Sequence, residues 1–142
     1  MNGLINRKNI YIVVFLISLS AMLGSLYFSE ILGLAPCELC WYQRILMYPI
    51  VLLSGVALYR KSKEVVFYAL PLSVIGIFIS GYQYALQMMP KANEISGPCS
   101  ATGPACSGIY LQYFGFITIP FMSMLAFVVI SVLLYISIRI DR

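Results

Sequence analysis

The chain has 142 residues, of which 61% are hydrophobic and only 10% are charged. Charges this sparse cannot cover the surface of a soluble domain, so the composition indicates a membrane protein. The net charge of +4 comes from few, scattered basic residues, which argues against a nucleic-acid partner, and the absence of histidine excludes ordinary His-ligated haem.

Four apolar blocks follow one another along the chain. Each is close to the ~20 residues that a helix needs to cross about 30 Å of hydrocarbon, and lipid cannot satisfy the backbone of an open strand. The spans are predicted at residues 10–28, 41–59, 65–88 and 116–138. We therefore expect an all-α membrane protein, an antiparallel bundle of four transmembrane helices that forms one domain over residues 1–142.

The first block could be mistaken for a signal peptide because it follows Arg7-Lys8. Its apolar run is longer than the usual core of about 7–15 residues. The cleavage-like tripeptide at 33–35 is followed by Pro36. We expect a first span that is retained.

The last apolar stretch, residues 109–138, is too long for the bilayer, since it would measure about 45 Å as one helix. Gly115 and Pro120 predict a break within it. A short interfacial segment at 109–114 is then expected to precede a span that begins near Ile117 and holds Pro120 in its first turn.

Basic residues are concentrated on one side of this topology. The opposite side has only Arg44 and Lys91. The positive-inside rule therefore predicts cytoplasmic termini and places the loops at 29–40 and 89–115 on the outer face of the cell membrane. The basic residues on the predicted cytoplasmic side are Arg7, Lys8, Arg60, Lys61, Lys63, Arg139 and Arg142.

The four cysteines form two close pairs, Cys37/Cys40 and Cys99/Cys106, and both pairs fall in the predicted outer loops. That compartment is where disulfides form and persist. Four cysteines allow three connectivities, and sequence alone does not choose among them. The clustering favours the two local pairings because short loops are easily closed.

Cys37 and Cys40 lie where the outer loop becomes the second helix, and Arg44 follows one turn later. Helical spacing places the three on one face, with Arg44 about 6 Å along the axis from Cys40. The helix N-terminus and Arg44 both favour thiolate. The pattern favours redox chemistry over a structural disulfide beside a snorkelling arginine, and over half of a zinc site.

Cys99 and Cys106 enclose six residues within a Gly- and Pro-rich connection. Such a pair forms either a structural disulfide that braces the loop or an exposed disulfide that a partner thiol can attack. A second couple on the same face favours exchange, since electrons pass between sulfurs by direct attack and two couples can work in series.

These residues resemble the DsbB family of membrane thiol:quinone oxidoreductases, and within it the shorter BdbC branch of Gram-positive bacteria. The matching motifs are PCELCWYQR at 36–44, GPC at 97–99 with Cys106, and FITIPFM at 116–122. With the four-span layout, the resemblance covers essentially the whole chain. Relatives of the vitamin K epoxide reductase type fit less well, because they carry the quinone-facing CxxC near the last helix.

The resemblance implies a direction of electron flow. An extracytoplasmic DsbA-like (BdbD-type) thiol oxidase attacks the Cys99–Cys106 disulfide, and the Cys37–Cys40 disulfide reoxidises the resulting thiols. The electrons then pass to a membrane quinone, menaquinone or ubiquinone, without a metal. The six-residue spacing of the second pair is shorter than in the better-known Gram-negative relatives, which leaves open which of its cysteines the partner meets.

The family's quinone site is carried over onto three residues. Cys40 is the cysteine that faces the quinone, Arg44 binds it, and Gln43 occupies the polar position just before that arginine. Aromatic residues of the outer half are expected to mark the membrane interface rather than line this site. They are Tyr82, Tyr84, Tyr110, Tyr113 and Phe114.

Three other classes fit the residues less well. A proton-coupled multidrug transporter needs an ionisable group within the membrane, whereas all acids here lie in loops or at helix ends. A carrier that reduces external disulfides needs a cysteine on the cytoplasmic side, where none is predicted. A scaffold with two structural disulfides predicts cysteines that stay oxidised. The acids are Glu30, Glu38, Glu64, Glu94 and Asp141.

Overall fold

The computed structural model describes most of the chain. The described residues are 6–33, 36–88, 112–113 and 117–140.

Four long helices make up the fold, as predicted. Each is long and apolar enough to cross a membrane. They are α1 (Arg7–Leu26), which continues as the π-helix η1 (Tyr27–Ile31), α2 (Glu38–Arg60), α3 (Val65–Met88) and α4 (Ile119–Ile140).

The predicted break before the last helix is present. α4 begins at Ile119 and holds Pro120 in its first turn, where a missing backbone N–H costs nothing. Two short strands precede it, β1 (Gln112–Tyr113) and β2 (Ile117–Thr118), which pair antiparallel. The rest of the predicted interfacial segment at 109–114 lies outside the described residues.

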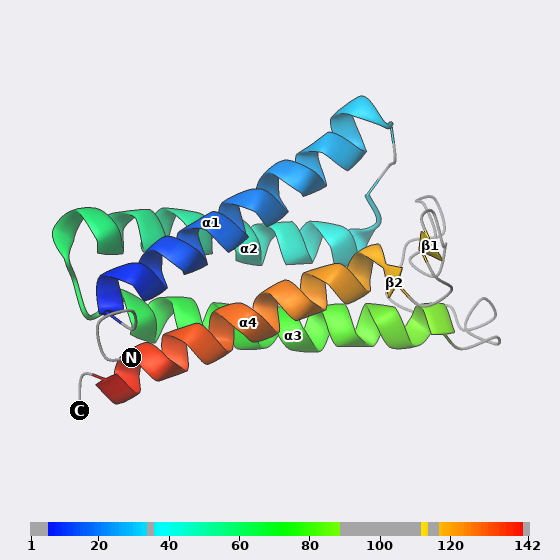
Figure 1. The fold of residues 1–142 in the computed structure, drawn as a ribbon. Coiled ribbons are helices and arrows are strands. Elements are labelled where there is room, and N and C mark those ends of the chain that lie inside the picture. Colours follow the sequence, from blue (N-terminus) through cyan, green and yellow to red (C-terminus); the bar gives the residue numbers. More distant parts are fainter. Residues whose placement is uncertain (1–5, 34–35, 89–111, 114–116, 141–142) are drawn as a thin grey trace.

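The helices form a closed ring in which α1 and α3 each pack against both α2 and α4. The start of α1, the end of α4 and the turn between α2 and α3 lie at one end of the bundle (Figure 1). The start of α2 and the end of α3 lie at the other end, where α1 and η1 diverge from α2 (Figure 1). The side of the membrane that each end faces stays a prediction.

The bundle has a thin apolar core and a largely apolar exterior. Val14 of α1, Ile50 of α2 and Phe127 of α4 are fully buried, whereas Leu52 and Phe78 are more than 70% exposed. Exposed side chains of this kind suit a lipid environment. Small polar side chains lie between the helices, as in the hydrogen bond that Ser131 donates to Ser73 at 2.8 Å.

Candidate active site

The first turn of α2 brings the sulfurs of Cys37 and Cys40 together. Cys37 is the N-cap residue, in extended conformation, and its carbonyl accepts the first helical hydrogen bond from the Trp41 N–H at 3.1 Å. Its side chain does not cap the helix but turns toward Cys40, where the two sulfur atoms lie 3.2 Å apart. A disulfide needs about 2.05 Å, so the thiols need only a small approach to form the bond once two electrons and two protons are removed.

Cys37 is the more protected of the two thiols, with only 4% of its surface exposed. Its S–H donates to the Cys40 sulfur, and this bond, followed by burial, raises the pKa of the Cys37 thiol well above its ordinary value. Cys37 therefore keeps its proton at neutral pH, and Cys40 is the acceptor of the pair.

Gln83 of α3 contacts both sulfurs, and the sequence reasoning missed it. Its Nε2 lies 3.3 Å from the Cys37 sulfur and 3.2 Å from the Cys40 sulfur. The side chain is 2% exposed. An amide within a largely apolar span was the available signal, because an intramembrane polar side chain needs a partner.

A short relay of hydrogen bonds supports Gln83 from behind. Gln43 of α2 donates from Nε2 to the Gln83 Oε1 at 2.7 Å. The Ser123 hydroxyl of α4 lies 2.6 Å from the Gln43 Oε1, to which it donates. Three helices are thereby joined at the level of the cysteines.

Arg44 turns inward to α1. Its Nε donates to the Ser25 hydroxyl at 2.7 Å and its Nη2 donates to the Ser25 carbonyl at 2.8 Å. The guanidinium carbon also lies 5.4 Å from the centroid of the Trp41 ring, within the range of a cation–π contact. Arg44 is buried, with 9% of its surface exposed. Its partners inside the protein offset the free-energy cost of placing a cation within an apolar helix.

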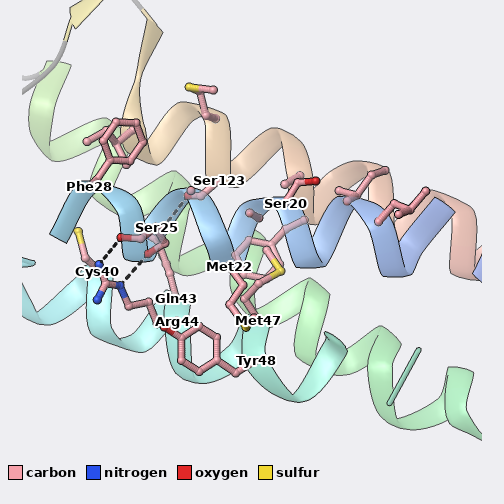
Figure 2. A pocket seen from close by; sticks show the side chains of 18 residues that line it. Ser20, Met22, Ser25, Phe28, Cys40, Gln43, Arg44, Met47, Tyr48 and Ser123 are labelled. Atoms are coloured by element: carbon pink, nitrogen blue, oxygen red, sulfur yellow. Dashed lines mark hydrogen bonds between the residues drawn. The ribbon is translucent and has the colours of Figure 1, made fainter. Parts of the chain in front are cut away.

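A cavity of about 500 Å³ opens beside these residues, between α1, α2 and α4. Cys40, Gln43 and Arg44 line it together with Ser25 and Ser123 (Figure 2). The rest of its wall is mainly apolar. That part consists of Leu16, Ile17, Ala21, Met22, Gly24, Phe28, Met47, Tyr48, Ile119, Met122, Ala126 and Phe127, with Ser20.

The structure thus brings together four of the six residues expected from sequence. Cys37 and Cys40 are in contact, and Cys40, Gln43 and Arg44 share one cavity. Cys99 and Cys106 lie outside the described residues. Tyr82 and Tyr84 are not among the described residues that line the cavity, and no cluster suited to a metal occurs in the part of the chain that the structure describes.

Comparison with known proteins gives a family for this arrangement. Residues 7–137 match the family described as "Disulfide bond formation protein DsbB". The chain belongs to the DsbB family. It is 50% identical to "Disulfide bond formation protein C" of Bacillus subtilis over 127 residues, which is 89% of this chain and 91% of that protein.

Further relatives carry similar names. A "Probable disulfide formation protein" of Oceanobacillus iheyensis is 45% identical over 89% of this chain and 86% of its own length. Another, of Coxiella burnetii, is 45% identical over 92% of this chain and 88% of its own length. No solved structure matches the chain.

Membership of the DsbB family gives the chain a coarse function. It is a member of a family of disulfide bond formation proteins, which implies oxidoreductase activity. With four helices able to cross a bilayer, it is a multi-pass membrane protein.

Proposed function

We propose that this DsbB-family protein makes disulfides de novo, by oxidising external thiols and passing their electrons through Cys37 and Cys40 to a membrane quinone. The observation that carries the proposal is the position of the paired sulfurs. They lie 3.2 Å apart, and Cys40 lines a mainly apolar cavity whose polar wall holds Arg44.

The cavity suits a quinone in size and in chemistry. A volume of about 500 Å³ lies within the usual range for small-molecule pockets, and it is walled by apolar side chains with a few polar groups at one place. Arg44, Gln43 and Ser25 are the polar groups that line the cavity and carry N–H or O–H donors for a ring carbonyl, and the apolar wall suits a hydrocarbon tail. Arg44 and Gln43 are the residues that we assign to quinone binding.

The chain's own residues supply the thiols and hold them. A bound quinone supplies the acceptor, taking two electrons and two protons to become a quinol. The Cys37 and Cys40 thiols give up those electrons and protons as their S–S bond forms. Gln83 holds both sulfurs during this change, and Arg44 presents a fixed positive charge at the same cavity.

The second pair supplies the next two electrons to the first. The Cys99 and Cys106 thiols reduce the Cys37–Cys40 disulfide and become a disulfide themselves. A DsbA-like (BdbD-type) dithiol then reduces that disulfide and leaves oxidised. Each exchange moves two electrons and two protons, so thiols and disulfides balance. This order places both pairs on the extracytoplasmic face.

Turnover with purified protein tests the proposal. A reduced dithiol peptide and a short-chain menaquinone analogue are supplied in detergent, and quinone loss is followed by absorbance against a protein-free blank. We expect turnover that disappears in Cys40→Ser. Ser54→Ala is the matched control, since Ser54 is buried in the same helix but bonds to its own backbone at Val51.

Two results would contradict the proposal. One is a wild-type protein that consumes no quinone in the presence of the dithiol. The other is a Cys40→Ser variant that turns over like Ser54→Ala, because the electrons would then bypass the pair.

A further inference from the structure

Gln83 is the polar side chain of α3 that reaches the reacting sulfurs. One Nε2 group lies within 3.3 Å of Cys37 and within 3.2 Å of Cys40. A primary amide has two N–H donors, so one can serve each sulfur. At 2% exposure no bulk water competes for these contacts.

The relay behind Gln83 determines which end of its amide faces the sulfurs. Ser123 lies 2.6 Å from the Gln43 Oε1, a shorter contact than the 3.0 Å that separates its hydroxyl from the Pro120 carbonyl. Ser123 therefore donates to Gln43, which turns the Gln43 Nε2 toward the Gln83 Oε1 at 2.7 Å. With its oxygen engaged, Gln83 can present only N–H donors to the cysteines.

Hydrogen-bond donors distinguish the two redox states of a cysteine pair. A thiolate or thiol sulfur carries more negative charge than a disulfide sulfur, and donors bind a charged acceptor more strongly. Contacts to the sulfurs therefore stabilise the reduced form over the disulfide. A stabilised reduced form makes a couple more oxidising.

We propose that Gln83, oriented by Gln43 and Ser123, raises the reduction potential of the Cys37–Cys40 couple and so makes this pair able to accept electrons from the loop cysteines. The inference rests on the proposed function, in which the pair cycles between dithiol and disulfide. Gln83 acts on the reacting atoms, whereas Gln43 and Ser123 are positioning residues.

The experiment is a redox titration of the isolated couple. Full-length protein carrying Cys99→Ser and Cys106→Ser retains one pair, which is equilibrated in glutathione buffers and quantified by alkylation and mass shift. Gln83→Met removes the donors at nearly constant volume. Its exchange constant should move about tenfold toward the disulfide, which is about 30 mV more negative.

Two further variants separate the relay from general loosening of the helices. Ser80→Ala removes another buried hydroxyl of α3, one that bonds to the Gly76 carbonyl, and should leave the exchange constant unchanged. Ser123→Ala should shift the constant in the same direction as Gln83→Met but less. In the Gln83→Met background the Ser123→Ala shift should vanish, as a double-mutant cycle requires of residues that act through one another.

The outcomes distinguish this inference from the function on which it rests. A pair that forms no disulfide in any buffer overturns the proposed function, and with it the inference. A pair that cycles normally, with the same constant in wild type and in Gln83→Met, overturns only the role of Gln83. If Gln83→Met does not fold, an unchanged constant in Ser123→Ala overturns the relay instead.

Discussion

Arg44 shows how a charged side chain can be accommodated in an apolar helix and still line a cavity. A guanidinium in an apolar helix is costly unless it has partners, and Ser25 supplies two oxygen acceptors. Because these contacts use Nε and Nη2, the group is held in one orientation at the cavity wall, to which Ser25 also contributes. We infer that Ser25 prepares Arg44 for a ligand instead of leaving it to reach the headgroups.

Replacing Arg44 should therefore weaken quinone use. In Arg44→Ala we expect the KM for a short-chain quinone to rise about ten- to a hundredfold, since a hydrogen bond to a charged group is worth about 1.5–3 kcal/mol. Thiol exchange between the two cysteine pairs should be largely unchanged. Steady-state kinetics at varied quinone concentration measure the first quantity, and alkylation after mixing measures the second.

Arg60→Ala is the control for this change. Arg60 lies in the last turn of the same helix and is exposed. It should leave the quinone KM at the wild-type value. An Arg44→Ala enzyme with unaltered quinone dependence would show that Arg44 has a structural role only.

At the scale of helices, the close approach of α3 and α4 is what sets Gln83 and Ser123 beside Gln43. Gly76 marks this contact, because a Cβ built there would lie 2.5 Å from the Phe127 ring. Phe127 is fully buried, so a methyl group at Gly76 would meet a packed ring. The two helices can pack at this distance only because Gly76 has no side chain.

A methyl group at Gly76 should therefore force the two helices apart. We expect Gly76→Ala to lose about 1–3 kcal/mol of stability, the usual cost of overpacking, and to unfold at a lower temperature in detergent. Gly81→Ala on the same helix should be tolerated, since its Cβ would meet the Met124 sulfur at an ordinary 3.8 Å.

A second substitution shows whether the ring is the cause. Phe127→Leu in the Gly76→Ala background should recover part of the lost stability by giving the methyl group space. Equal unfolding temperatures for wild type and Gly76→Ala would mean that α3 and α4 do not pack as closely as described.

The end of α1 also shapes the site. The wider turn of η1 begins at Tyr27, two residues after Ser25, and π-helical turns are frequent at functional sites. Here α1 diverges from α2 (Figure 1), and Phe28 of η1 lies at the cavity that remains between them (Figure 2).

At the scale of the molecule, hydropathy sufficed to predict the four spans, and the positions of glycine and proline sufficed to predict the break before the last one. The predicted second span, 41–59, lies within α2, and Pro120 lies in the first turn of α4 as expected. Lipid imposes this regularity, because each helix must satisfy its own backbone hydrogen bonds and must match the thickness of the bilayer.

The site was only partly predictable. Cys37, Cys40 and Arg44 belong to one segment, so helical spacing sufficed to place them on one face. Gln83, Ser25 and Ser123 come from three other helices, and their approach to α2 depends on packing that no local pattern encodes. The strand pair before α4 was likewise not expected, since two-residue strands leave no periodicity to detect.

The central claim is that the Cys37–Cys40 pair exchanges electrons with quinone, and thiol trapping in cells tests it most directly. Intact cells that cannot make quinone are treated with an alkylating reagent that adds mass, before and after a short-chain menaquinone is supplied. A variant with Cys99→Ser and Cys106→Ser provides the control: supplied quinone should still oxidise its first pair, because the second pair only delivers electrons to the first. We expect Cys37 and Cys40 to be free thiols without quinone and to become a disulfide when quinone is restored; a pair that stays disulfide-bonded throughout would contradict the account.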